Sequence, residues 1–128
     1  MTRERPLAGD DRRFPRRVYG SGSEPDVRFS LANERTYLAW IRTSLALLAV
    51  GIALEALQLP IERGFSVVAT FIFIALGALA PVQAWLGWMR TERALRSDRP
   101  LPAPMLAGPL GAGTFIAAAL LLVGLLLR

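Results

Sequence analysis

Three long apolar segments with few charges dominate the last two-thirds of the chain. They cover residues 37–59, 65–89 and 106–127. A helix of about 20 apolar residues rises ~30 Å, which is the thickness of the hydrocarbon layer of a bilayer. The pattern therefore predicts an all-α protein with three transmembrane helices in a small bundle.

The boundaries of these helices follow from capping and helix-breaking residues. The first helix is expected to begin near Ser30, whose hydroxyl caps free backbone N–H groups, and to end just before Pro60. Pro81 lies inside the second helix and is expected to bend it. Residues 90–104 are predicted to form a polar loop, and the third helix is expected to begin between residues 106 and 113.

Residues 1–27 have a different composition from the rest of the chain. They contain three prolines, a Gly-Ser-Gly-Ser linker and charges of both signs, without apolar periodicity. This composition is typical of disorder, and the recurring charges leave no apolar core for a signal peptide. We therefore expect a disordered tail over residues 1–27 and a membrane domain over residues 28–128.

The composition also limits the chemistry that the chain supports. It has no cysteine and no histidine, and no phosphate-binding loop or metal-ligand cluster stands out. We therefore expect neither an enzyme nor a bound cofactor. All 15 basic residues are arginine, and the net charge is +5. In a membrane protein this balance indicates topology and contact with the lipid bilayer, and we expect no nucleic-acid partner.

The arginines are distributed asymmetrically along the chain. They lie mainly before the first predicted helix and between the second and third, whereas the first loop holds only Arg63, offset by Glu62. The positive-inside rule then predicts a cytoplasmic N-terminus and an external C-terminus. Trp40, Trp85 and Trp88 are expected at the cytoplasmic interface, which indole rings prefer.

One face of the first predicted helix combines arginines with small residues. Arg28, Arg35 and Arg42 recur every seven residues and therefore lie on one side of the helix. Small or short side chains share that side: Ala39, Thr43, Ala46, Val50 and Ala53. Small residues let helices approach closely in lipid, so we predict that this is a packing or lumen face.

Two roles are open for this face. In the first, Arg35 and Arg42 pair with Glu34, Glu92 or Gln83, because Arg42 lies about one and a half turns inside the apolar segment, where a lone charge is costly. In the second, basic side chains from several helices or subunits form a vestibule that attracts anions. Three short helices make a thin bundle with an unpaired face that bears arginines, so we expect a homo-oligomer or a partner membrane subunit.

The stretch Leu31–Thr43, with the sequence LANERTYLAWIRT, resembles the signature of the YidH-like family. These are small bacterial inner-membrane proteins built on a domain of unknown function. The same domain forms the three-helix membrane part of the eukaryotic vacuolar transporter chaperone complex, which makes polyphosphate and moves it across a membrane. The resemblance covers about residues 28–127 and implies location in the bacterial inner membrane.

In that complex, basic residues at the start of the first helix and the end of the second line a polyphosphate path. The resemblance carries this role over to Arg28, Arg35 and Arg90, and Glu34 matches an acid of the same motif. The chain lacks the polymerase and phosphate-sensing domains of the larger subunits. We therefore expect a structural or accessory membrane protein first, and an oligomeric channel or transport component for polyanions such as polyphosphate as the alternative.

Overall fold

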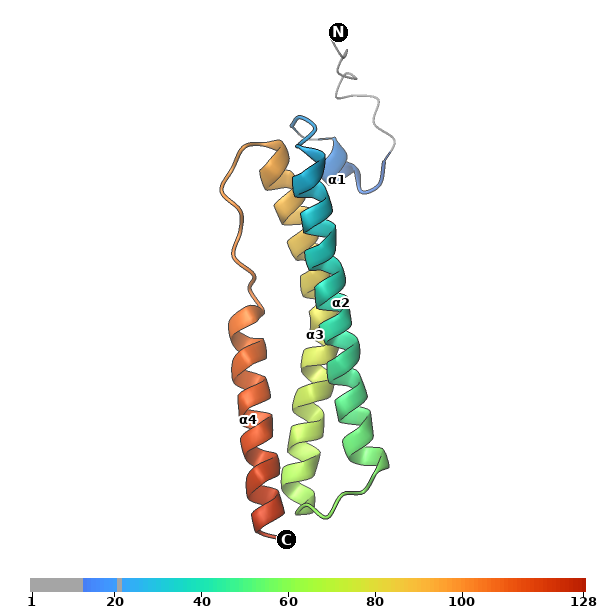
Figure 1. Cartoon of the computed structure of the whole chain (residues 1–128), viewed down its shortest axis with the longest axis vertical. Coiled ribbons are helices and arrows are strands. Elements are labelled where there is room, and N and C mark those ends of the chain that lie inside the picture. Colours follow the sequence, from blue (N-terminus) through green and yellow to red (C-terminus); the bar gives the residue numbers. More distant parts are fainter. Residues whose placement is uncertain (1–12, 21) are drawn as a thin grey trace.

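The computed structural model describes residues 13–20 and 22–128, which form four helices (Figure 1). They are α1 (Arg16–Tyr19), α2 (Val27–Ala56), α3 (Arg63–Arg96) and α4 (Ala107–Leu126). The three longer helices are each long and apolar enough to cross a membrane. The all-α class and the three transmembrane helices are confirmed. Residues 1–12 and 21 of the predicted tail lie outside the described residues.

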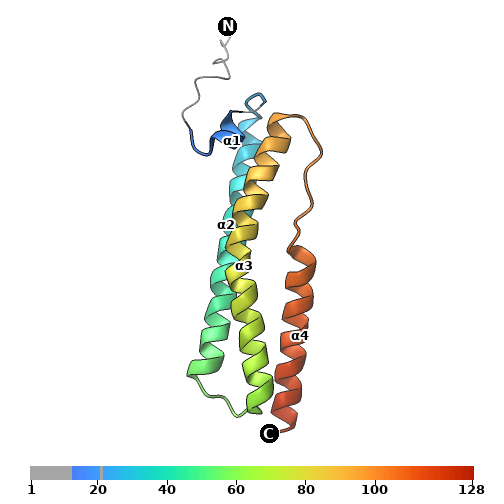
Figure 2. The same ribbon diagram turned by 180° about the vertical axis from the view of Figure 1, so that it is seen from behind.

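The central helix of the bundle is α3. Both α2 and α4 pack against it, whereas no Cα atom of α2 lies within 8 Å of a Cα atom of α4 (Figures 1 and 2). On the α4 side, Gly113 lies against Ile72 and Leu76 of α3. The bundle is therefore an open row of helices, and one face of α2 is left without an intramolecular partner.

The contact between α2 and α3 follows a seven-residue repeat. The α2 residues on this seam are alternately three and four positions apart: Ser30, Asn33, Tyr37, Trp40, Ser44, Leu47, Gly51 and Leu54. This spacing is that of the seam between two long helices that wrap around each other. The Ser44 hydroxyl donates a 2.6 Å hydrogen bond to the carbonyl of Gly77, so the two backbones approach closely at this point.

The predicted ends of the first helix were wrong by a few residues. α2 begins at Val27, and Asp26 rather than Ser30 caps it, with its carboxylate accepting a 2.9 Å hydrogen bond from the Arg28 N–H. It ends at Ala56, before the expected limit, and Gln58 then adopts a φ of 47°. A carboxylate that accepts a hydrogen bond from a free backbone N–H group stabilises the first turn of a helix, which explains why α2 begins before Ser30.

The second helix is longer than expected. α3 continues through Pro81 and extends to Arg96, so the prediction of a loop over residues 90–104 was wrong for its first half. The loop covers residues 97–106, and Asp98 turns the chain there with a φ of 50°. α4 begins at Ala107, within the predicted interval.

The described part of the predicted disordered tail folds against α3. Residues 13–20 and 22–26, which we call the N-terminal arm, include α1 and lie beside the C-terminal end of α3 (Figures 1 and 2). Val18 of α1 is fully buried. Gly22, with a φ of 65°, lies against the Arg96 carbonyl, which accepts a 3.0 Å hydrogen bond from the Ser23 N–H.

The register of the helices shows which parts lie at the same level. α4 has 20 residues, and a helix of that length rises ~30 Å, enough to cross the hydrocarbon layer. Gly113 contacts Leu76, so the start of α4 lies level with about residue 82 of α3. Gly77 contacts Leu48, so the same level meets α2 at about Arg42.

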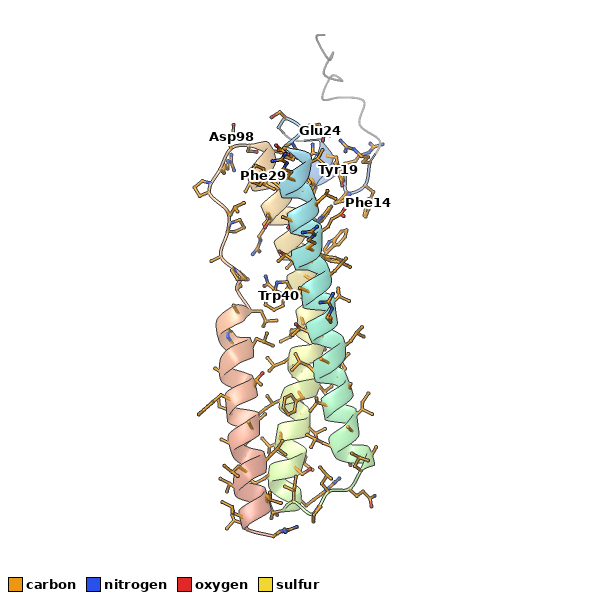
Figure 3. All side chains as sticks on the ribbon, in the orientation of Figure 1. Phe14, Tyr19, Glu24, Phe29, Trp40 and Asp98 are labelled. Atoms are coloured by element: carbon orange, nitrogen blue, oxygen red, sulfur yellow. The ribbon has the colours of Figure 1, made fainter. Side chains whose placement is uncertain are left out.

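Arg42 therefore lies level with the start of α4. Figure 3 shows Trp40 near the level where α4 begins. The parts of α2 before this level and of α3 after it extend ~20 Å beyond α4. These extensions, with the N-terminal arm and the 97–106 loop, form what we call the basic end of the molecule.

Candidate functional site at the basic end

Among the described residues, every arginine except Arg63 and Arg128 lies in the basic end. At the opposite end, Arg63 pairs with Glu55 at 2.8 Å. The charge asymmetry predicted from the sequence is therefore a property of the folded molecule. The basic end also holds the buried polar residues Asn33, Glu92 and Arg96, and we take it as the candidate site.

Glu92 is the centre of a buried polar network between α2 and α3. Its carboxylate accepts hydrogen bonds from the Asn33 amide at 3.3 Å and from the Ser30 hydroxyl at 3.4 Å. The same Asn33 amide donates a second bond, of 3.1 Å, to the Trp88 carbonyl. Buried polar groups are tolerated when they are hydrogen-bonded, so this network joins the two helices beyond the level of α4.

Arg96 is the buried cation of the basic end. Its guanidinium lies 3.3 Å from the Glu24 carboxylate and 4.0 Å from that of Glu92. It also lies over the Tyr19 ring, with its central carbon 4.7 Å from the ring centre, in the geometry of a cation–π contact. Because Glu24 and Tyr19 belong to the N-terminal arm, Arg96 fastens the arm to α3.

A second arginine strengthens this attachment from within the arm. Arg13 forms an ion pair with Glu24 and lies over the Tyr19 ring at 4.3 Å. The hydrogen bond from Arg13 lowers the pKa of the Glu24 carboxyl; partial burial opposes this shift, and the positive charge of Arg96 adds to it. Glu24 is therefore ionised, and its carboxylate pairs with the guanidinium groups of both Arg13 and Arg96.

A row of aromatic rings continues the contact between the arm and α3. Phe14 stacks on Trp85 with ring centres 6.3 Å apart, Trp85 stacks on Trp88 at 5.5 Å, and Tyr19 lies 6.3 Å from Trp88. Figure 3 shows Phe14, Tyr19 and Glu24 together at this end of the molecule. Trp85 and Trp88 lie about one to two turns beyond the level where α4 begins.

The predicted arginine face does not pack inside the molecule. Arg28, Arg35 and Arg42 are exposed, and so are Ala39 and Ala46 beside them. Within one chain α3 lies on the other side of α2, so a packing or lumen role for this face stays a prediction. The face remains free for contacts outside the chain.

The predicted ion partners of these arginines are also placed elsewhere. Glu92 is held by Ser30, Asn33 and Arg96. The described residues show no ion pair of Arg35 or Arg42 with Glu92 and no hydrogen bond of either arginine with Gln83. Glu34 is exposed. The pairing prediction was wrong because Arg35 and Arg42 lie on the side of α2 that faces away from α3.

Two of the predicted site residues do meet in a cavity. Gln83 and Arg90 line a pocket of about 120 Å³ between α2, α3 and the 97–106 loop. Asn33, Tyr37 and Trp40 lie on its wall, among further residues of α2, α3 and the loop. The Arg90 guanidinium also lies 3.2 Å from the sulfur of Met105. The six predicted residues thus separate into an outer face on α2 and an interhelical pocket.

Sequence reasoning missed the residues that connect the basic end internally, notably Asn33, Arg96 and Tyr19. One signal was available for Asn33, because it falls on the seven-residue repeat with Ser30 and Ser44. No comparable signal identified Arg96, since its partners Glu24 and Tyr19 lie in a segment that was predicted to be disordered.

The three apolar helices and the basic end that continues two of them define a multi-pass membrane protein. The family model described as "Domain of unknown function (DUF202)" matches residues 28–94, and the chain belongs to this family. The match covers nearly all of α2 and of α3, including Asn33 and Glu92.

Curated relatives agree with this assignment. The chain is 45% identical over 85 residues to the inner membrane protein YidH of Escherichia coli K12, which covers 63% of this chain and 71% of YidH. It is 44% identical over 92 residues to the uncharacterized protein Rv2272 of Mycobacterium tuberculosis, covering 70% of this chain and 75% of that protein. No solved structure matches the chain. These relatives and the apolar helices identify a multi-pass protein of the bacterial inner membrane.

Proposed function

We propose that the protein is a structural subunit of a homo-oligomeric assembly in the inner membrane, with no enzymatic activity. The observation that carries this proposal is the free face of α2. Ala32, Ala39, Ala46 and Ala53 recur every seven residues on this face, and the first three are exposed in the single chain. Arg28, Arg35 and Arg42 flank them.

The physical argument rests on helix packing in lipid. Hydrocarbon chains solvate an exposed apolar helix as well as a protein does, so exposure alone does not imply a partner. A small residue at every seventh position, however, lets a second helix approach along the full length of the face. The α2 faces of two copies would then pack together, as the two-fold symmetry of most homodimers requires.

We further propose that the basic end lies in the cytoplasm. The positive-inside rule favours this orientation because the arginines of the basic end outnumber the single ion-paired Arg63 and the terminal Arg128 at the opposite end. The C-terminus then lies outside, in the periplasm.

Disulfide crosslinking in the membrane tests the assembly. The chain contains no cysteine, so a single Ala46→Cys substitution reports on this position alone. We expect a crosslinked dimer for Ala46→Cys and none for Leu45→Cys, whose side chain is 63% exposed but lies ~100° further around the helix. Equal crosslinking of both variants, or of neither, would contradict the proposed interface.

A second candidate function is attraction of polyanions such as polyphosphate by the assembled basic ends. The exposed row of Arg28, Arg35 and Arg42 on α2 supports it, because none of these three side chains forms an ion pair with a carboxylate among the described residues. Guanidinium groups pair well with phosphate. An oligomer would bring several such ladders together at the membrane edge.

Flux measurements in liposomes separate the two candidates. For the polyanion candidate, Arg35→Gln/Arg42→Gln lowers polyphosphate uptake while assembly survives, whereas Arg128→Gln, at the opposite end, leaves uptake unchanged. Absence of polyphosphate uptake by the wild-type protein would exclude this candidate and leave the structural subunit. Loss of assembly in the double variant would assign the arginines to packing.

A further inference from the structure

Rings from three parts of the chain line the interhelical pocket. They come from α2, α3 and the 97–106 loop: Tyr37, Trp40, Trp88, Pro102 and Pro104. Figure 3 shows Trp40 close to the end of the loop that leads into α4. The volume of the pocket, about 120 Å³, approaches the ~150 Å³ of an engineered apolar cavity that binds benzene. The pocket therefore has room for one small aromatic ring.

The charges around this pocket are unbalanced. Arg90 lines it as a cation, and none of the described lining residues is acidic. The Arg90 guanidinium lies 3.2 Å from the Met105 sulfur, a weak acceptor, and forms no ion pair among the described residues. Glu92, the buried acid of α3, is outside the pocket lining and is held by Asn33 and Arg96. The pocket therefore offers one positive charge to a bound molecule.

Gly87 leaves open space next to the side chain of Gln83. A Cβ at Gly87 would lie 3.1 Å from the Gln83 amide nitrogen and, apart from its chain neighbours, would meet no other side chain within 4 Å. Both residues line the pocket, and Gln83 lies two turns before Arg90 on the same side of α3, ~10 Å away along the axis. A molecule with an anionic group at Arg90 therefore has room for its body beside Gly87, with the Gln83 amide beyond it.

We propose that the interhelical pocket binds a small aromatic carboxylate of the size of benzoate. The carboxylate pairs with the Arg90 guanidinium through charge-assisted hydrogen bonds, and the ring lies beside Gly87 among the aromatic walls. A polyvalent phosphate does not fit this site, because one guanidinium neutralises a single charge and a further buried charge without a partner is costly. The site is separate from the exposed Arg28, Arg35 and Arg42, and it does not depend on how α2 assembles with other copies.

Fluorine NMR of para-fluorobenzoate, added to the full chain in phosphatidylcholine nanodiscs, tests the site. We expect saturable binding, and about tenfold weaker binding of para-fluorobenzamide, which keeps the ring but carries no charge. Arg90→Gln should weaken binding of the benzoate by about the same factor and remove its advantage over the benzamide. Arg93→Gln removes the same charge from an exposed position of α3 outside the pocket, and it should leave both affinities unchanged.

Filling the pocket tests the position of the ring without changing any charge. In Gly87→Leu the added side chain occupies the space beside Gln83, so binding of both probes should be lost. Gly111→Leu adds the same side chain to α4 at a position where nothing lies within 4 Å of the Cβ, and binding should be unchanged. Circular dichroism and size-exclusion chromatography verify that both variants fold. If Gly87→Leu does not fold, the comparison of the two probes in the wild type and in Arg90→Gln decides the matter.

Four results would overturn the proposal. The first is the absence of saturable binding of para-fluorobenzoate to the wild-type protein. Equal losses in Arg90→Gln and Arg93→Gln would mean that net charge alone attracts the anion. Undiminished binding in a folded Gly87→Leu variant would place the ring outside this pocket. Displacement of para-fluorobenzoate by inorganic phosphate at a lower concentration than unlabelled benzoate requires would identify a phosphate site instead.

Discussion

The side-chain amide of Asn33 donates a 3.3 Å hydrogen bond to the carboxylate of Glu92, joining α2 to α3 where both side chains are buried. The same amide bonds the Trp88 carbonyl. This contact lies beyond the level of α4, in the parts of α2 and α3 that belong to the basic end. The two helices are therefore held together there by polar bonds as well as by apolar packing.

Replacing Asn33 by Ala should destabilise the protein. The change removes the donor of one Glu92 oxygen and the second hydrogen bond to the Trp88 carbonyl, and a lost buried hydrogen bond costs ~1–3 kcal/mol. Thermal unfolding in detergent measures the effect. Glu34→Ala, at an exposed neighbouring position, is the matched control and should change the midpoint little. Equal midpoints for the two variants would show that the network contributes no stability.

Replacing Arg96 by Gln should release the N-terminal arm from α3. The variant loses the ion pair with Glu24 and the cation–π contact with Tyr19. Limited trypsin digestion should then cleave at Arg16 and Arg17 several-fold faster. Arg93→Gln, at an exposed position in the last turn of α3, should leave the cleavage rate unchanged. An unchanged rate in Arg96→Gln would mean that the remaining contacts, among them the aromatic row and the Ser23 hydrogen bond to the residue-96 backbone carbonyl, hold the arm without this side chain.

Attachment of the arm should weaken in acid. The folded-state pKa of Glu24 is lowered, chiefly by its hydrogen bond from Arg13. A lowered pKa means that the stabilisation is complete at pH values above the ordinary glutamate range and is lost as the pH falls through the lowered value. Tryptophan fluorescence, which senses the Phe14 and Tyr19 contacts, should report a reversible change in that window. Glu24→Gln should lack this transition; if it titrates as the wild type does, another group is responsible.

Replacing Gly77 by Ala should separate α2 from α3. A Cβ at this position would lie 2.8 Å from Leu48 Cγ and 3.1 Å from the Leu48 backbone nitrogen, so one helix must shift. Overpacking of this kind costs ~1–3 kcal/mol. Gly111→Ala adds the same group to a helix where nothing lies within 4 Å, and it should be neutral or slightly stabilising. Comparison of the two unfolding midpoints in detergent checks the prediction, which equal midpoints would contradict.

The three-helix fold was predictable from the sequence because length and apolarity alone identify a segment that spans the bilayer. The helix ends were less predictable. The extension of α3 to Arg96 was missed because charged residues after Met89 resemble a loop, whereas an amphipathic helix that leaves the membrane also carries them. The Asp26 cap was missed because Ser30 offers the same chemistry four residues later.

The candidate site was predicted only in part. The exposed Arg28, Arg35 and Arg42 do share one face of α2, because helical periodicity fixes the direction of side chains along a single helix. Which neighbour that face meets is not a property of one helix. The sequence placed Glu92 near these arginines by depth, but depth does not specify the direction in which α3 lies.

The sequence by itself determined the membrane class, the number of transmembrane helices, the charge asymmetry and the common face of the arginines, since each depends on composition or on the geometry of one helix. Only the tertiary structure decided that α3 is the central helix, that Arg96 rather than Arg42 is the buried cation, and that the arm returns to α3. These features depend on contacts between residues far apart in the chain, such as Glu24 and Arg96, whose pairing no local pattern encodes.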